Sequence, residues 1–361
     1  MSNEDKLQSI RQRIDALDEQ IQDLINQRAA CAEEVARIKN SSGAAVNYYR
    51  PEREAEVLRR VKARNRGPLS AEEMARLFRE IMSACLALEQ PMQIAFLGPE
   101  GTYTHAAALK HFGHSVNTVP MATIDEVFRE VEAGTVHYGV VPVENSTEGV
   151  VTHTLDKFLS SPLNVCGEVL LRIHHQFLAT QTDRSRIKKI YSHQQSLGQC
   201  REWLDANMPH AERIAVSSNA EAARLAAQDD TAAAIASTTA AEIYGLQILA
   251  ANIEDQPDNT TRFLVIGRPT VPAGGHDKTS LLVSTGNRPG ALFQLLSPLA
   301  EHGLSMTRIE SRPSRQGLWE YVFFIDIEGH QADSKVALAL EALKHKAVTL
   351  RILGSYPKAV I

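Results

Sequence analysis

The chain has 361 residues, of which 43% are hydrophobic and 22% are charged, and its formal net charge at neutral pH is −5. This length predicts two or three domains, each with a core of its own. The composition is typical of globular proteins, and the mildly negative charge argues against nucleic acid or an anionic membrane as a partner.

The start of the chain is polar, and no apolar run approaches the roughly 18 residues that a membrane-spanning helix needs. We therefore expect neither a signal peptide nor a membrane span, and a cytoplasmic location. The four cysteines are far apart and form no C-x-x-C pair. This spacing predicts no metal site and no disulfide framework, and a reducing compartment. Nothing in the composition calls for a cofactor.

Residues 5–39 contain no Pro or Gly and predict one long helix. Apolar residues recur in it at alternating spacings of three and four, which is typical of a coiled-coil seam. A helix of this length spans roughly 50 Å, too long for one small domain to bury, so we expect a homodimer or a higher homo-oligomer. Arg28 interrupts the seam, either as a polar residue that fixes the register or as part of an anion site between helices.

Two shorter helices are predicted to follow. A charged cluster at residues 49–54 opens the first of them, which runs to about Arg64. The sequence Ser70-Ala71-Glu72-Glu73 is a capping box, and it predicts the start of the other helix, which continues to Glu89. The domain assigned to residues 1–92 is therefore all-α.

This helical region resembles the all-helical chorismate mutases. The resemblance implies a Claisen rearrangement of chorismate to prephenate, which needs a clamp on a dicarboxylate and donors at the ether oxygen. Arginines suit such a clamp because they hold carboxylates with two hydrogen bonds. Two departures from the family pattern are Arg50, where an Asp is frequent, and Cys85, where a small polar residue is usual. The resemblance implies catalytic roles for Arg28, Lys39 and Glu89, and substrate-binding roles for Arg11, Arg53 and Glu54.

Strand and helix signals alternate over residues 93–269, which predicts an α/β domain. The apolar run from Tyr138 to Val143 ends abruptly in Glu144-Asn145-Ser146-Thr147. Polar groups at the carboxyl ends of buried strands mark the usual place of ligands in open α/β sheets, although turn caps alone give the same pattern. Two further polar stretches, residues 192–195 and 260–263, also follow or precede predicted strands.

Together with Gly98-Pro99-Glu100-Gly101-Thr102, these stretches resemble prephenate dehydratase in order and spacing over the whole of residues 93–269. The resemblance implies two α/β subdomains with the site in the cleft between them, as in a type 2 periplasmic binding protein. It also implies that the Thr261 hydroxyl is essential, and we interpret it as a hydrogen-bond donor to the departing oxygen. The substrate-binding candidates are Thr102, Asn145, Ser146, Gln195 and Arg262.

Several side chains of this region allow two interpretations. Arg262 either binds a substrate carboxylate or braces the cleft, and Glu144 is either a buried acid or a structural acceptor. His174 and His175 fall within a predicted strand, residues 165–177, and are interpreted as structural. Gln194 stands where the family usually has Pro, which changes the turn rather than the chemistry.

Residues 269–277 form a Pro/Gly-rich linker, and residues 278–361 then predict the order βαββαβ, an α+β ferredoxin-like fold. Residues 287–292 and 310–313 resemble the ACT regulatory domain of phenylalanine-sensitive dehydratases. The resemblance implies phenylalanine as effector; the alternative is a dimerisation module without ligand. The implied effector-binding residues are Gly290, Ala291, Leu292, Glu310, Ser311 and Arg312.

The three resemblances together imply a multidomain enzyme of phenylalanine biosynthesis that acts first on chorismate and then on prephenate, under feedback inhibition by phenylalanine. One alternative is a mutase–prephenate dehydrogenase, against which the missing glycine fingerprint for a nicotinamide cofactor argues. Another is an amino-acid-sensing regulatory protein with a binding-protein-like cleft, in which the helices serve only dimerisation.

Overall fold

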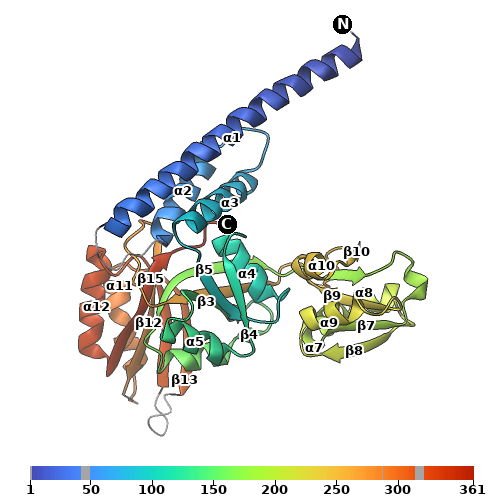
Figure 1. The fold of residues 1–361 in the computed structure, drawn as a ribbon. Helices are drawn as coiled ribbons and strands as arrows, with labels where there is room; N and C mark the ends of the chain where they lie inside the picture. The colour runs from blue at the N-terminus through green and yellow to red at the C-terminus, as the bar shows by residue number, and fades with distance from the viewer. Residues whose placement is uncertain (1, 42–48, 287, 314–320) are drawn as a thin grey trace.

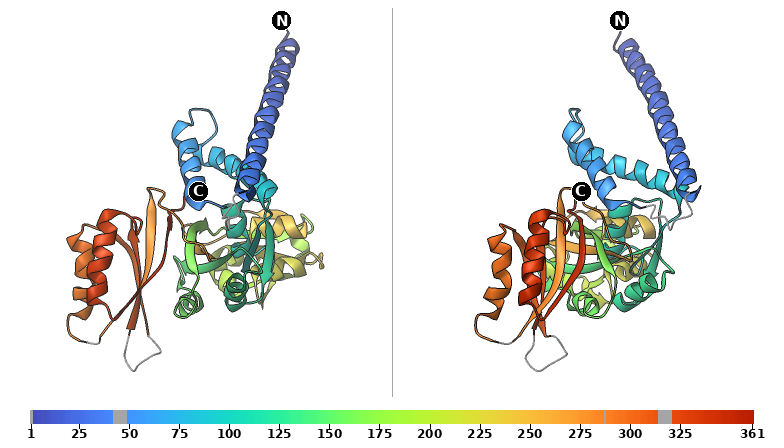
Figure 2. Two further views of the ribbon diagram at one scale, coloured as in Figure 1. Left: turned by 60° about the vertical axis from the view of Figure 1, so that its left-hand side comes forward. Right: turned by 90° about the vertical axis from the view of Figure 1, so that its left-hand side faces the viewer.

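The computed structural model describes residues 2–41, 49–286, 288–313 and 321–361. A helical domain, an α/β domain with two sheets and a C-terminal domain with one sheet follow one another along the chain (Figure 1). The N-terminal helix projects away from the remainder of the molecule, as the turned views confirm (Figure 2). Within the described residues no helix combines the length and the apolar character needed to cross a membrane.

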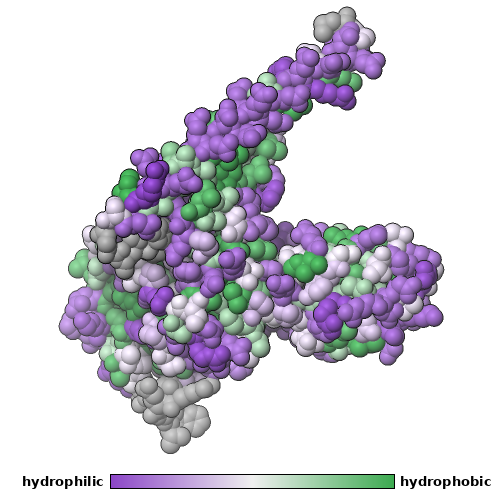
Figure 3. All heavy atoms as spheres, in the orientation of Figure 1, coloured by the Kyte–Doolittle hydropathy of each residue, from purple (hydrophilic) through white to green (hydrophobic). Residues whose placement is uncertain are grey.

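The helical domain consists of α1 (Asn3–Ser41), α2 (Pro51–Arg64) and α3 (Ala71–Glu89), which confirms the three predicted helices. The Ser70 hydroxyl accepts a hydrogen bond from the Glu73 N–H and caps α3. Helix α1 has one buried residue among those described, Ala36. Most of the apolar seam of this helix is exposed, at Leu7, Ile10, Ile14, Leu17, Ile21, Leu24, Val35 and Ile38. The side of the projecting helix seen in Figure 3 is mostly hydrophilic, with hydrophobic atoms at its edge.

The first subdomain of the α/β domain is built on a sheet with strand order β2-β1-β3-β11-β5, to which β4 is added beside β3. Parallel pairing joins β1 to β2 and β3, whereas β11 runs antiparallel to β3 and β5. Its elements are β1 (Gln93–Leu97), α4 (Tyr103–Phe112), β2 (Asn117–Met121), α5 (Ile124–Ala133), β3 (Tyr138–Asn145), β4 (Gly149–Val150), α6 (Thr152–Phe158), β5 (Asn164–Arg172) and β11 (Thr260–Gly267).

The second subdomain has a five-stranded sheet with strand order β10-β6-β9-β7-β8. It is an excursion of the chain between β5 and β11 and lies to one side of the first sheet (Figure 1). Its elements are β6 (Gln176–Ala179), η1 (Arg184–Arg186), β7 (Lys189–His193), α7 (Gln194–Gln199), α8 (Arg201–Asn207), β8 (Glu212–Val216), α9 (Asn219–Ala226), β9 (Ala232–Ala236), α10 (Thr238–Tyr244) and β10 (Gln247–Ala250).

Two crossing segments, residues 173–175 and 251–259, join the subdomains. The sequence predicted one strand over residues 165–177, and this prediction is wrong, because the chain leaves the first sheet after Arg172 and enters the second at Gln176. Backbone hydrogen bonds link the two crossing segments to each other. The Ile173 N–H donates to the Asn259 carbonyl, and the Ile253 N–H donates to the His175 carbonyl. The two crossings therefore form one connected hinge region.

The C-terminal domain shows the predicted βαββαβ order, with its strands arranged β13-β14-β12-β15. One sheet face carries both helices, and Leu282, Phe324 and Tyr356 of the sheet share a core with residues of the α/β domain. A Cβ atom at Gly354 would lie 2.2 Å from the Val165 carbonyl oxygen, so only glycine permits this approach of β15 to β5. The elements are β12 (Asp277–Thr285), α11 (Ala291–Glu301), β13 (Met306–Pro313), β14 (Tyr321–Glu328), α12 (Ser334–Lys346) and β15 (Thr349–Pro357).

Candidate active sites

A cationic cavity of about 420 Å³ lies among the three helices of the N-terminal domain. Five of the six residues singled out in this domain line it, and they come from all three helices: Arg28, Lys39, Arg53, Glu54 and Glu89. Arg11 does not, because it stands on the same helix as Arg28 but roughly 25 Å away. Arg50, the departure from the family pattern, also lines this cavity.

The carboxylates of this cavity have different partners. Glu89 Oε2 lies 3.4 Å from Lys39 Nζ at one end. Glu54 is ion-paired with Arg79. Burial raises the pKa of Glu54, and the Arg79 guanidinium opposes that rise. Arg53 is more than half exposed and pairs with Glu56 at 2.6 Å, so its guanidinium lies at the rim. The arrangement suits a compact ligand with two carboxylates.

A second cavity, of about 320 Å³, lies in the cleft between the two subdomains of the α/β domain. It brings together four predicted residues: Thr102, Asn145 and Thr261 from the first subdomain and Gln195 from the second. Thr102 caps α4, and its hydroxyl donates to the Leu97 carbonyl while it accepts the His105 N–H. Gln195 lies in the first turn of α7 on the opposite wall of the cleft.

Asn145 and Thr261 stand opposite each other on the paired strands β3 and β11. The Asn145 side-chain amide donates to Thr261 Oγ1 at 2.8 Å and to Asn259 Oδ1 at 2.7 Å. Asn145 Oδ1 accepts the N–H groups of Thr147 and Glu148, which orients the amide. Because Thr261 Oγ1 accepts from Asn145, its own hydroxyl proton is available to an acceptor in the cavity.

This hydrogen-bonded pair continues into the hinge region. Asn259 Nδ2 donates to Gln199 Oε1 at 3.4 Å, and the same oxygen lies 2.8 Å from His175 Nε2. His175 Nδ1 lies 2.8 Å from the Tyr103 hydroxyl. Since Gln199 Oε1 can only accept, this contact favours the tautomer of His175 that carries its proton on Nε2. Burial lowers the pKa of His175, which favours the neutral form of the ring.

Sequence analysis missed four residues of this network: Tyr103, His175, Gln199 and Asn259. All four line the cleft. The placement of the two histidines in a strand hid their position at the hinge. His174 is also at the hinge, where its Nδ1 lies 2.7 Å from Glu254 Oε1 and links the two crossing segments.

Comparisons with known proteins match each domain separately. The family model of chorismate mutase type II matches residues 10–90, that of prephenate dehydratase residues 94–271, and that of the ACT domain residues 279–345. Two curated bifunctional chorismate mutase/prephenate dehydratases match the whole length of this chain and of their own chains. The protein from Stutzerimonas stutzeri is 60% identical and that from Pseudomonas aeruginosa is 57% identical.

The chain belongs to the bifunctional chorismate mutase/prephenate dehydratase family. It is an enzyme with a mutase domain, a dehydratase domain and an ACT domain. Among solved structures, prephenate dehydratase from Arthrobacter aurescens in complex with L-Phe is 38% identical, with a TM-score of 0.68. The match covers 73% of this chain and 89% of that chain, and so extends well beyond the dehydratase domain alone.

Two substrate-binding candidates of the dehydratase domain do not line the cleft. The Ser146 hydroxyl accepts the Thr260 N–H at 2.9 Å and donates to the Asp258 carbonyl, so it closes a turn between the strands. Arg262 points away from the cleft to Glu168, Asp326 and Tyr356. The structure therefore supports a bracing role for Arg262 rather than contact with a substrate carboxylate. Glu144 pairs with Arg308 of the ACT domain at 3.1 Å, as a structural acceptor.

The effector candidates of the ACT domain fall on two elements. Gly290 caps α11 with a φ of +75°, a conformation that favours glycine, and Ala291 and Leu292 form the first turn. Glu310, Ser311 and Arg312 lie on the edge strand β13. Arg312 pairs with Asp156 of the dehydratase domain at 3.0 Å, so this side chain has a partner within the chain.

Proposed function

We propose that the protein converts chorismate to prephenate in the mutase pocket and prephenate to phenylpyruvate in the dehydratase cleft, under inhibition by phenylalanine. The Asn145–Thr261 hydrogen bond within a cleft that two subdomains form is the observation that carries the proposal. The membership of the chain in the bifunctional family supports it throughout.

In the mutase pocket, Arg28 and Lys39 hold the substrate carboxylates and favour its compact conformer. The rearrangement needs no nucleophile, because orientation and stabilisation of charge on the ether oxygen account for the acceleration. We assign Glu89 to that oxygen. A carboxyl group donates a hydrogen bond only when it is protonated.

The mutase site requires a second chain in this proposal. The exposed apolar seam of α1 fits a second copy of the same helix in antiparallel orientation. That arrangement would place the partner's Arg11 beside Arg28, which Arg11 of the same helix cannot reach. A homodimer is therefore the smallest form that completes the mutase pocket.

In the dehydratase cleft, prephenate loses its ring carboxylate as carbon dioxide and its ring hydroxyl as water, and one proton is consumed. Thr261 donates a hydrogen bond to the departing oxygen, and Asn145 holds the Thr261 hydroxyl in place. The described residues that line the cleft include no Lys or Arg. A cation on the ring carboxylate would oppose the loss of carbon dioxide, so a neutral polar lining favours this step.

The regulatory part of the proposal has two supports. The chain has an ACT domain, and the Arthrobacter relative of known structure was crystallised with L-Phe. Inhibition requires that phenylalanine favour a less active arrangement of the dehydratase cleft. A cytoplasmic location rests on composition alone and stays a prediction.

One assay tests the proposal: chorismate is added to the full chain, and prephenate and phenylpyruvate are measured with and without phenylalanine. We expect both products in sequence and a lower rate of phenylpyruvate formation with phenylalanine. Gly290→Val and Glu310→Ala should weaken the inhibition more than they lower kcat. Turnover of prephenate that depends on a nicotinamide would support the dehydrogenase alternative, and phenylalanine binding without turnover would support the sensor.

A further inference from the structure

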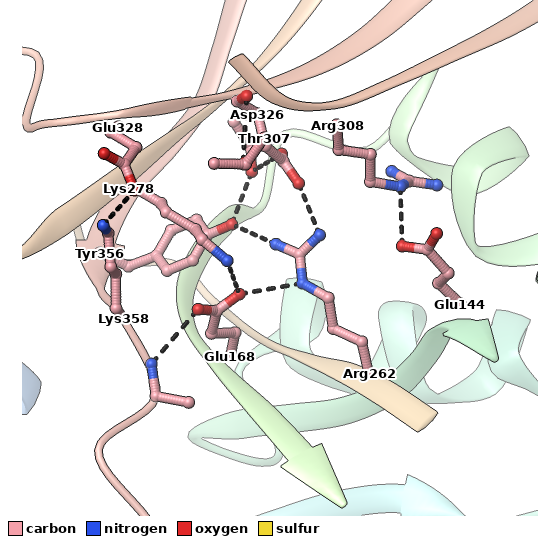
Figure 4. A network of polar contacts seen from close by, with 12 residues as sticks. Glu144, Glu168, Arg262, Lys278, Thr307, Arg308, Asp326, Glu328, Tyr356 and Lys358 are labelled. Carbon is pink, nitrogen blue, oxygen red and sulfur yellow. Dashed lines mark hydrogen bonds and ion pairs between the residues drawn. The ribbon is translucent and has the colours of Figure 1, made fainter. Parts of the chain in front are cut away.

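Each strand of the Asn145–Thr261 pair carries a charged neighbour that faces the ACT domain. The register of β3 and β11 places Thr261 opposite Asn145 and Arg262 opposite Glu144. Successive side chains of a strand point to opposite faces. The cleft therefore receives Asn145 and Thr261. Glu144 and Arg262 extend to the ACT sheet, as Figure 4 shows.

Arg262 is held by a buried network that spans both domains. Its Nε lies 2.9 Å from Glu168 Oε2, its Nη1 lies 2.5 Å from Asp326 Oδ2, and its Nη2 donates to the Tyr356 hydroxyl at 3.0 Å. The side chains of Arg262, Glu168 and Asp326 are 10%, 1% and 6% exposed. Loss of one member would leave buried charges unpaired, so the network ties β11 rigidly to β14.

Glu144 forms the second connection. Its Oε2 lies 3.1 Å from Arg308 Nε, and the Arg308 side chain is 10% exposed. Arg308 belongs to β13, the strand that also carries the effector candidates Glu310, Ser311 and Arg312. Strand β13 pairs with β14, which carries Asp326. A displacement of β13 and β14 against the dehydratase domain would therefore reach both strands that carry the Asn145–Thr261 pair.

We propose that the ACT domain sets the position of Asn145 and Thr261 through two ion pairs, Arg262–Asp326 and Glu144–Arg308, which we call the clasp. Glu144 and Arg262 are positioning residues that act through their strand neighbours. The effector inhibits by shifting the clasp, a statement that rests on the proposed regulation by phenylalanine. A displacement of the reacting groups by about 1 Å is enough to cost about 100-fold in rate.

The experiment compares Glu144→Gln and Asp326→Asn, which keep the side-chain shape and remove the charge. For each we expect the dehydratase kcat to fall about 10-fold, with the KM for prephenate changed less than about 2-fold. Phenylalanine should inhibit both variants by less than about half of its wild-type effect. The mutase kcat/KM, measured on the same samples, should stay at the wild-type value.

A matched control variant and a charge-reversal double variant distinguish a specific effect on the position of Asn145 and Thr261 from a general loss of folding or activity. Glu328→Gln removes an exposed ACT carboxylate whose partner is Lys358, and it should leave kcat and inhibition unchanged. Glu144→Arg places like charges together and should lower kcat further than Glu144→Gln. The double variant Glu144→Arg/Arg308→Glu restores an opposite-charge pair and should recover most of that loss.

The outcomes separate this proposal from the proposed function. Failure of the wild-type chain to form phenylpyruvate would overturn the proposed function itself. Wild-type turnover and inhibition combined with unchanged kinetics in Glu144→Gln and Asp326→Asn would overturn the clasp alone. Equal losses of mutase and dehydratase activity, or a double variant no better than Glu144→Arg, would also overturn it, because a specific connection predicts neither.

Discussion

The mutase pocket and the dehydratase cleft are similar in size, but the pocket is lined by cations and the cleft mainly by neutral polar groups. Four cationic side chains line the pocket: Arg28, Lys39, Arg50 and Arg53. Among the described residues that line the cleft there are none, and amide and hydroxyl groups prevail. We attribute the contrast to the fate of the carboxylates, because the proposed rearrangement keeps both to the end whereas the proposed dehydration releases one as carbon dioxide.

The two sites also differ in what completes them. The cleft is formed within one chain by two subdomains and a hinge. The pocket lies beside α1, whose apolar seam is exposed over most of its length. This difference predicts that mutase activity depends on the association of chains, whereas dehydratase activity depends on the internal hinge and on the ACT domain.

The largest expected effect is that of a substitution in the dehydratase cleft, which should impair one of the two activities and leave the other intact. Thr261→Ala should lower phenylpyruvate formation by about 1,000-fold, because the departing oxygen loses its donor. Mutase activity should change by less than about 2-fold, since the pocket lies in another domain. Product assays from chorismate and from prephenate measure both steps, and Thr260→Ala, on the same strand but outside the cleft, serves as the control. Equal loss of both activities would contradict separate sites.

The second prediction tests the dependence of the mutase on a second chain. Arg11→Ala and Arg28→Ala should each lower mutase activity by about 100-fold. Subunits of the two variants, mixed and allowed to exchange, should recover about a quarter of wild-type activity, because half of the dimers are mixed and each has one intact site. Hybrids that dimerise normally and stay inactive would show that each pocket is complete within one chain.

The third prediction concerns the contact between the helical mutase domain and the α/β dehydratase domain. Tyr49 precedes α2, and its hydroxyl lies 2.8 Å from His111 Nε2 on α4. Burial, followed by the Arg79 charge, lowers the pKa of His111 to about 3, below its usual value of 6.5. Between these values the unfolded chain binds a proton that the folded chain does not, so stability falls as pH falls through this window.

For the wild-type chain, the free energy of unfolding should be about 2 kcal/mol lower at pH 5 than at neutral pH because of this one group. In His111→Gln this part of the pH dependence should disappear, although the variant is less stable at neutral pH. Urea unfolding at pH 7 and pH 5 measures the difference. Identical pH dependence in the two proteins would mean that His111 does not remain neutral at this interface.

The smallest expected effect tests the role of Glu89. Because only a protonated carboxyl donates a hydrogen bond, the mutase kcat/KM of the wild-type chain should decrease as pH rises. Glu89→Gln supplies a donor at every pH, so its profile should be flatter and a few-fold higher than wild type above neutrality. If the two pH profiles superimpose, Glu89 is not the hydrogen-bond donor to the ether oxygen, and the alignment of α3 with the chorismate mutase family is wrong.

The strand register explains why the sequence left two roles open for Arg262, the neighbour of Thr261. The predicted strand covered residues 263–266, whereas β11 begins at Thr260. Once Thr261 and Arg262 belong to a strand, they must face opposite sides. Local composition does not reveal where a strand begins, because Thr260 and Thr261 suit a strand and a polar turn alike.

Periodic apolar patterns and capping residues were sufficient to predict the three helices, the alternating α/β region and the βαββαβ domain, because these patterns act over neighbouring residues. The hinge at His174 and His175 was decided by tertiary structure, since its backbone groups bond to residues about 80 positions later in the chain. The same holds for the buried Arg262–Asp326 pair, whose two residues are 64 positions apart. Contacts of this kind depend on how the sheets pack against each other, and no local pattern encodes that.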